Sequence, residues 1–186
     1  MSAAWRHDGA RAGFEVVFGA TTADGCRFEG HCTAVEEGQP WSVGYVITVD
    51  PAWVTRSAEI RELSQGGRTA RLLEHDGDGQ WLVNGAAAPA LEGCLDADLE
   101  ASAFTNALPV RRLRLGVGES GRSPAAWVRS PGLGVERLEQ GYARLPDAEG
   151  LRRFGYEAPQ LGFRAELRYD EAGMGMDYPG LAVRVL

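Results

Sequence analysis

Alternation of apolar and polar residues, with a period of two, runs through most of this 186-residue chain. A strand places successive side chains on opposite faces, so this period predicts strands with one buried face. Short stretches rich in glycine, aspartate and proline separate these segments, which is typical of antiparallel meanders. The predicted strands are Phe14–Phe18, Arg27–Cys32, Val43–Val49, Trp53–Ile60, Arg68–Leu73, Gln80–Val83, Ala125–Arg129, Val135–Tyr142, Arg153–Glu157, Phe163–Tyr169 and Leu181–Leu186.

So many strands do not suit one flat sheet, because it would expose long edges and a whole apolar face. The sequence therefore predicts a mainly β fold, in which a many-stranded antiparallel sheet is rolled into a barrel-like shape around a single helix. The best helical segment runs from about Asp96 to Leu108 and is followed by Pro109, which stops helices. No linker composition or internal repeat is present, so we expect one domain over residues 1–186.

Charge and composition exclude several classes of function. The formal net charge is −7, which repels a polyphosphate, so we expect no nucleic-acid partner. All 19 basic residues are arginine, which excludes a lysine Schiff base, a lysine general base and the phosphate-loop lysine. The start of the chain has no apolar signal region and no long apolar run follows, so we predict a cytoplasmic protein without a transmembrane segment.

Three cysteines do not make a disulfide framework. Cys26 and Cys32 lie about 20 Å apart if they share one strand, well beyond disulfide reach. We therefore expect free thiols. The histidines His7, His31 and His75 stand alone, and none has a second ligand at a helical metal spacing. We predict no metal site and no cofactor. The exposed-serine turn of α/β-hydrolases is missing, although a triad assembled from distant residues stays open.

The segment from Gly93 to Leu115 concentrates the charged residues of interest. Asp96 and Asp98 stand at alternate positions, so on a strand both carboxylates would share one face. Such a pair can bind a hard cation or act as an acid and a base, and it can equally cap a helix or pair with arginine. The sequence leaves these alternatives open.

The stretch from Pro109 to Val117 is expected to be a strand, with Leu113 and Val117 on its apolar face. Arg111 falls on the same face. A buried guanidinium needs a carboxylate or a polar ligand, so we expect Asp96 or Asp98 as its partner. This cluster is either a structural ion pair or a polar anchor for a ligand.

Several motifs, taken together and in order, resemble the bacterial putative glycolipid-binding family of spiral β-roll proteins. The most specific part is Thr-Asn-Ala-Leu-Pro-Val-Arg-Arg-Leu at residues 105–113, close behind Gly-Cys-Leu-Asp-Ala-Asp at residues 93–98. Further matches are Tyr45 with Asp50, Trp53 and Thr55; Gly79-Gln-Trp81 with Gly85; Gln140-Gly-Tyr142; and Asp177-Tyr-Pro-Gly-Leu181 with Arg184.

The resemblance implies a many-stranded antiparallel sheet wrapped around one helix, which agrees with the fold predicted from the alternation of apolar and polar residues. It also implies a glycolipid or another amphiphilic small molecule as the partner, held by a non-enzymatic protein. The expected ligand-binding residues are Asp96, Asp98, Asn106, Arg111, Arg112, Gln140, Tyr142, Asp177 and Tyr178. We expect no catalytic residue. The alternatives are an enzyme that acts on a sugar or lipid through Asp96 and Asp98, and an assembly module with no ligand. A homodimer formed through a free sheet edge is a further option.

Overall fold

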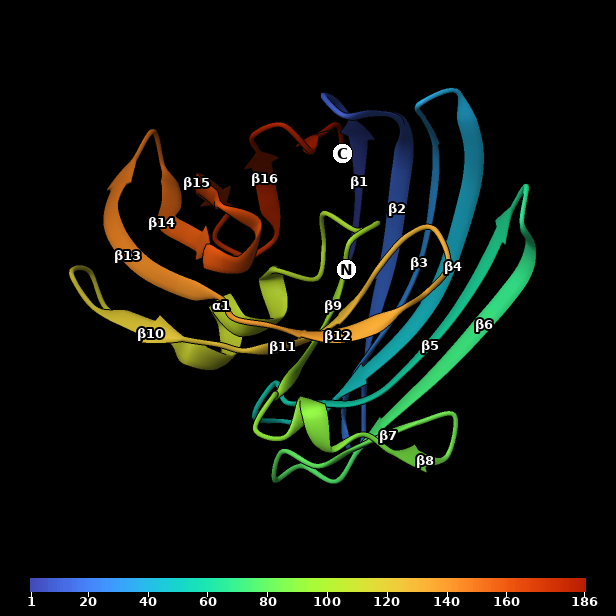
Figure 1. The fold of residues 1–186 in the computed structure, drawn as a ribbon. Helices are drawn as coiled ribbons and strands as arrows, with labels where there is room; N and C mark the ends of the chain where they lie inside the picture. Colours follow the sequence, from blue (N-terminus) through green and yellow to red (C-terminus); the bar gives the residue numbers. More distant parts are fainter.

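The computed structural model describes residues 1–186 and confirms the predicted mainly β fold. Figure 1 shows a large curved sheet that wraps around a helix and a small second sheet. The large sheet contains β1 (Ser2–His7), β2 (Arg11–Thr22), β3 (Gly25–Glu36), β4 (Gln39–Val49), β5 (Thr55–Ser64), β6 (Gly67–His75), β7 (Trp81–Val83), β8 (Ala86–Ala87), β10 (Ser120–Arg122), β13 (Gly141–Ala148), β14 (Leu151–Ala158), β15 (Phe163–Tyr169), β16 (Gly175–Tyr178) and β17 (Ala182–Arg184). The remaining elements are β9 (Asp96–Leu99), β11 (Ala125–Val128), β12 (Val135–Leu138), α1 (Ala107–Leu113) and the 3-10 turns η1 (Pro89–Leu91) and η2 (Pro159–Leu161).

All neighbouring strands of the large sheet are antiparallel, in the order β10-β13-β14-β15-β16-β17-β1-β2-β3-β4-β5-β6-β7-β8. The C-terminal strand β17 pairs with β1, so the two ends of the chain meet in the middle of the sheet. The sheet is not closed, because β10 and β8 each have a neighbour on one side only. Rolling therefore buries one face of the sheet and leaves two edges.

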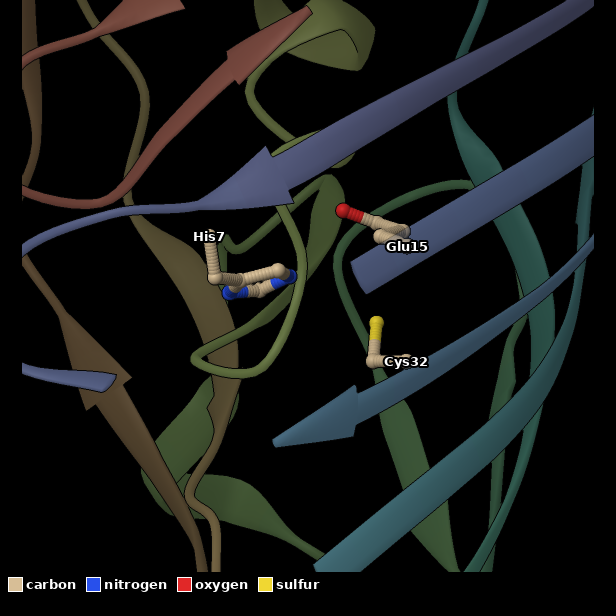
Figure 2. Close-up of side chains that lie close together, drawn as sticks. All are labelled: His7, Glu15 and Cys32. Atoms are coloured by element: carbon tan, nitrogen blue, oxygen red, sulfur yellow. The ribbon is translucent and has the colours of Figure 1, made fainter. Parts of the chain in front are cut away.

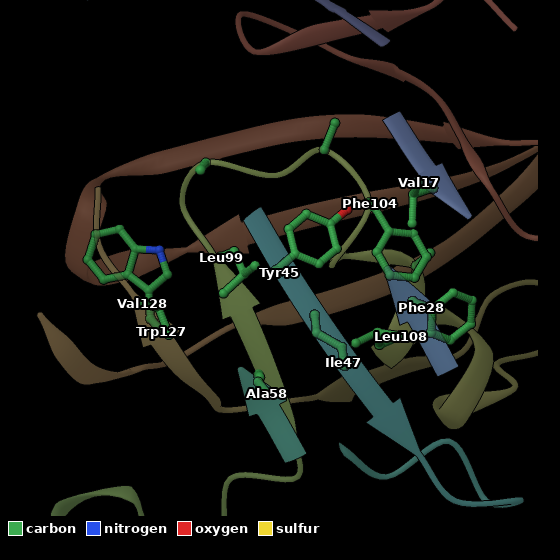
Figure 3. Close-up of a cluster of buried hydrophobic side chains, with 14 of the residues drawn as sticks. Val17, Phe28, Tyr45, Ile47, Ala58, Leu99, Phe104, Leu108, Trp127 and Val128 are labelled. Carbon is green, nitrogen blue, oxygen red and sulfur yellow. The ribbon is translucent and has the colours of Figure 1, made fainter. Parts of the chain in front are cut away.

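The core lies on the concave face, where strand alternation places the large apolar side chains. In β3, buried residues alternate with exposed ones from Phe28 to Ala34. The small sheet fills the interior, and every residue of β9 and β11 is buried. Figure 3 shows Phe104, from the loop after β9, between Phe28 and Tyr45. The ring centroids of Phe104 and Phe28 are 4.7 Å apart.

The predicted helix over residues 96–108 is wrong. Asp96–Leu99 forms β9, which pairs in parallel with Ala125–Val128, and the helix is Ala107–Leu113. Pro109 therefore lies in the first helical turn, where its missing N–H needs no partner, so this proline marks the start of a helix and not its end. The predicted strand from Pro109 is wrong for the same reason. No helix in the structure has the length and apolar character needed to cross a bilayer.

Another predicted strand, Val135–Tyr142, divides into two. β12 ends at Leu138, β13 begins at Gly141, and the chain passes from the small sheet to the large one between them. The side chain of Gln140 is buried at this crossing, with an exposed fraction of 3%. The crossing thus carries a polar group into the interior of the roll.

Candidate functional site

A cavity of about 240 Å³ lies between the small sheet and the strands β14 to β16; we call it the Asp98 cavity. Its polar lining comes from Arg11, Asp98, Glu100, Ser102 and Asn106. Its apolar and aromatic lining comes from Leu99, Trp127, Leu138, Tyr156, Leu161, Phe163, Tyr178, Pro179 and Leu181, next to Gly180. Apolar walls around a few converging polar groups are typical of small-molecule sites.

Asp98 is the centre of a buried hydrogen-bond network at this cavity. The Thr105 hydroxyl donates to its Oδ1 at 2.7 Å, and Gln140 Nε2 donates to its Oδ2 at 2.6 Å. Gln140 Nε2 also donates to the hydroxyl of Tyr156 at 3.0 Å. Both of these donors are neutral groups, and no arginine forms an ion pair with this carboxyl group. The network holds a carboxylate in the interior without an ion pair.

Asn106 extends the same network. Its Nδ2 donates to the Tyr142 hydroxyl at 2.8 Å, and that hydroxyl donates to Gln140 Oε1 at 3.3 Å. Asn106 precedes α1, and its backbone oxygen accepts a weak hydrogen bond from Tyr169 at 3.4 Å. The predicted residues Asp98, Asn106, Gln140 and Tyr142 therefore lie together. Tyr178 lines the same cavity, so five of the nine predicted ligand-binding residues belong to one region.

Asp96 and Arg112 form a separate pair. Arg112 Nη2 donates to Asp96 Oδ2 at 2.6 Å, and its Nε donates to Oδ1 at 3.2 Å. The hydroxyl of Ser123 donates to the same carboxylate at 2.6 Å. Asp96 is 1% exposed, and it shares a face of β9 with Asp98 because the two are alternate strand residues. This ion pair fixes β9 against α1 beside the cavity.

Arg111 does not pair with Asp96 or Asp98, contrary to the expectation. The helical phase turns it the other way, and its guanidinium lies 4.4 Å from the centroid of the Trp53 ring. Arg112, the next residue, takes the carboxylate instead. Asp177 also lies apart from the network, because successive strand residues face opposite ways and Tyr178 is the one that lines the cavity.

Burial raises the pKa of Asp98 above its ordinary value, and hydrogen bonds from Thr105 and Gln140 offset this only in part. The folded protein therefore holds this proton more tightly than the unfolded chain does. The resulting stability is complete below the unfolded pKa of about 3.9 and is lost as pH rises through the folded pKa.

The variant Asp98→Asn lacks this titration, and rotation of the neighbouring hydroxyl and amide groups lets it keep the same contacts. We expect its free energy of unfolding to increase relative to wild type as the pH rises from about 4 to about 7. Urea unfolding at a series of pH values measures this difference. A difference that stays constant with pH, or that falls, would contradict a raised pKa for Asp98.

A larger hollow of about 850 Å³ lies over β10, β13, β14 and β15. Its floor includes Gly141, Ala143 and Gly155, which alternate along the strands with the buried Tyr142 and Tyr156. The floor therefore faces away from the core. Two arginines and a glutamate stand around it, Tyr142 and Tyr156 also border it, and no buried carboxylate or amide converges on it. The Asp98 cavity is the better candidate site.

Sequence reasoning missed two groups of this site. Thr105 was part of the quoted motif, yet nothing in its spacing showed that its hydroxyl donates to Asp98. Arg11 comes from β2, far along the chain, and lines the cavity while its Nη2 donates to the backbone oxygen of Glu100 at 2.5 Å. Tyr156 is different, because the sequence already offers it as one of several aromatic residues that could line a ligand cavity, and it lines this one.

Comparison with known proteins agrees with this architecture. No match was found among curated proteins. Among solved structures, the crystal structure of a DUF1089 family protein from Pseudomonas aeruginosa is similar, with a TM-score of 0.81 and 34% sequence identity. The similarity covers 97% of this chain and 95% of the other. A family model described as "Putative glycolipid-binding" matches residues 2–184, so the chain belongs to that family.

Proposed function

We propose that this protein binds the polar head of a glycolipid, or of a similar amphiphile, in the Asp98 cavity and does not change it chemically. The observation that carries the proposal is a buried carboxylate, held only by neutral donors, at the wall of an aromatic cavity. The family description gives the same ligand class. A cytoplasmic location and a homodimer stay predictions.

The polar lining suits a sugar. Carboxylate and amide oxygens accept hydrogen bonds from hydroxyl groups, and the guanidinium of Arg11 donates to their oxygens. The rings of Tyr156, Phe163 and Tyr178 provide apolar faces for the sugar ring, with centroids about 6 Å apart.

The size of the cavity restricts what enters. Pockets for drug-sized ligands have volumes of about 300–1,000 Å³. A cavity of about 240 Å³ is smaller and accepts one small polar unit, such as a single sugar ring. Leu161 is 50% exposed and Leu181 is half-buried, and both line the cavity. We place the apolar part of the ligand along these leucines, where it would cover exposed apolar surface.

The alternative of an enzyme using Asp96 and Asp98 has weaker support. Asp96 is buried in its ion pair with Arg112 and does not line the Asp98 cavity, so a substrate there would not reach it. A general acid or base must reach the substrate proton directly or through one water. The alternative of a module without a ligand predicts no ligand-sized void, and the Asp98 cavity supports the binding proposal over it.

Native mass spectrometry of freshly purified protein, followed by organic extraction, tests the proposal. We expect a bound amphiphile of discrete mass. In the Asp98→Asn variant, affinity for that amphiphile should fall by about tenfold or more, because a charge-assisted hydrogen bond contributes about 1.5–3 kcal/mol. An apo mass that persists after incubation with a mixed lipid and glycolipid extract would overturn it.

Two further variants separate the parts of the site. Glu29→Gln changes an exposed carboxylate on β3 and should leave binding unchanged. Arg111→Ala removes the arginine that stacks on Trp53, outside the Asp98 cavity. Normal binding in Arg111→Ala together with weak binding in Asp98→Asn would locate the ligand in the cavity. The reverse pattern would place it at Trp53 and contradict the proposal.

A further inference from the structure

Three potential metal ligands meet in the interior, beside the Asp98 cavity but outside it. His7 on β1, Glu15 on β2 and Cys32 on β3 are all buried, and one ligand atom from each lies within 4.8 Å of the others. Figure 2 shows the imidazole, the carboxylate and the thiol pointing toward one another. The mechanism proposed for ligand binding uses none of them.

Strand register brings these residues together. Glu15 and Cys32 are directly opposite each other on β2 and β3. His7 lies opposite Gly13, two residues before Glu15, so it is the diagonal neighbour of Glu15 on the same face. A Cβ at position 13 would clash with the backbone of Thr33 and Ala34, so glycine lets β2 and β3 approach closely here. Three adjacent strands of one sheet therefore present three ligands to one point.

His7 has no hydrogen-bond partner at either ring nitrogen, although it is only 3% exposed. Leaving a buried polar group unpaired costs about 1–3 kcal/mol, and such groups are rare. Glu15, by contrast, accepts hydrogen bonds from Tyr45, Ser102 and the Ala103 backbone N–H. The unpaired imidazole beside a thiol and a carboxylate is the observation that points to a missing partner.

We propose that His7, Glu15 and Cys32 bind one divalent transition-metal ion of the Zn²⁺ class. A thiolate, an imidazole and a carboxylate are the donors that Zn²⁺ and Co²⁺ prefer, whereas Mg²⁺ and Ca²⁺ prefer oxygen ligands only. Three protein ligands with one nitrogen, one oxygen and one sulfur donor match the ligand number of many zinc sites. The sequence-based prediction of no metal site used spacing along the chain, which does not show ligands that meet across strands.

The geometry requires little movement. Ligand atoms around Zn²⁺ lie about 2.0–2.3 Å from the ion and therefore about 3–4 Å from one another, so the 4.8 Å limit closes with a shift of about 1 Å. Once Glu15 and Cys32 have lost their protons, their two negative charges balance the two positive charges of the ion. The one fixed cation nearby is Arg11, whose charge acts on both His7 and Cys32.

Burial affects all three ligands: it lowers the pKa of His7 and raises the pKa values of Glu15 and Cys32, so a metal must compete with protons at the last two. Burial, with a further contribution from Arg11, lowers the pKa of His7 to about 4, so the imidazole is neutral and free to bind a metal. Burial raises the pKa of the Cys32 thiol well above its ordinary value, so the thiol is protonated without a metal. Binding then replaces the thiol proton with the ion, and the proton leaves to water.

The ion would also contact the wall of the Asp98 cavity indirectly. Glu15 Oε1 accepts a hydrogen bond from the Ser102 hydroxyl at 2.5 Å, and Ser102 lines that cavity. The metal site and the ligand site are therefore one hydrogen bond apart. The metal proposal does not depend on the ligand, and its test uses the metal alone.

The test is titration of metal-free protein with Zn²⁺ by calorimetry and with Co²⁺ by absorption spectroscopy. We expect one equivalent of metal and a thiolate-to-Co²⁺ charge-transfer band in the near ultraviolet. Cys32→Ser should abolish this band, and His7→Gln should weaken Zn²⁺ binding by about tenfold or more, since even outer-shell changes cost about 10–100-fold. Glu15 is not used as a probe because three hydrogen bonds within the fold depend on it.

Matched variants control for other thiols and imidazoles. Cys26→Ser, Cys94→Ser and His31→Gln change the same residue types elsewhere and should keep the band and the affinity. Circular dichroism of each variant confirms that it folds. Absence of the band in wild-type protein, or its persistence in folded Cys32→Ser, would overturn the proposal whatever the result of the amphiphile test.

Discussion

Replacing Asp96 with alanine should destabilise the protein by about 3–5 kcal/mol, because the change removes one partner of a buried ion pair. Arg112 would keep its charge with 13% of its side chain exposed, and the buried hydroxyl of Ser123 would lose its acceptor. Chemical denaturation with urea measures the loss. The expected result is a lower midpoint with an unchanged slope, since the unfolded chain is unaltered.

The exposed pair between Arg27 and Glu29 provides the control. Its atoms lie 2.7 Å apart, close to the 2.6 Å of the buried pair, but its side chains are 45% and 60% exposed. Glu29→Ala should cost no more than about 1 kcal/mol. The double variant Asp96→Ala with Arg112→Ala should cost less than the sum of the two single changes. Equal effects of Asp96→Ala and Glu29→Ala would show that the buried pair is not needed for stability.

Phe104→Ala should destabilise the protein by about 3–5 kcal/mol, the usual cost of removing a buried aromatic ring. Phe104 is 1% exposed, and its ring packs against Phe28 and is stacked parallel to Tyr45 at a centroid distance of 6.5 Å. Its backbone N–H donates to Ser102, so it also anchors the loop that ends at Asn106. Affinity for the amphiphile should fall with stability, because the loop holds part of the Asp98 cavity.

Phe18→Ala is the matched control, since Phe18 is 63% exposed on β2. Thermal or urea unfolding should change by no more than about 0.5 kcal/mol, as is usual for surface substitutions. A loss in Phe104→Ala that is no larger than in Phe18→Ala would mean that the loop does not pack as described. Affinity for the same amphiphile is measured in both variants. Phe18→Ala should keep the wild-type affinity, so a lower affinity in Phe104→Ala alone is due to the loop.

Alternation of residues was enough to predict most of the large sheet, because each strand has one buried face and turns of few residues join neighbours. It was not enough for β9. Asp96–Leu99 is buried on both faces and pairs in parallel with a strand that begins at Ala125, so its signal lies in a partner distant along the chain. Local propensity favoured a helix there, and tertiary pairing outweighed it.

The helical conformation of α1 determines which arginine pairs with Asp96. On a strand, Arg111 would face the interior with the apolar residues, whereas the seven-residue helix α1 turns Arg112 toward Asp96 and Arg111 toward Trp53. The prediction of a carboxylate–arginine pair was therefore correct in its chemistry and wrong in the residue. The cluster of Asp98, Asn106, Gln140 and Tyr142 came from the family motifs, since spacing alone does not bring residues 98 and 140 together.

The open sheet affects how the interior can adapt to its contents. A closed barrel has a fixed circumference, because any widening must stretch or break the ladder of hydrogen bonds around it. Here no ladder joins β8 to β10, and these edge strands are only two and three residues long, so few free backbone groups are available to a strand from another molecule. The curvature of the sheet can change while every existing strand pair stays intact. The curvature is therefore set by the side chains that pack inside the roll, with no closing ladder to limit it.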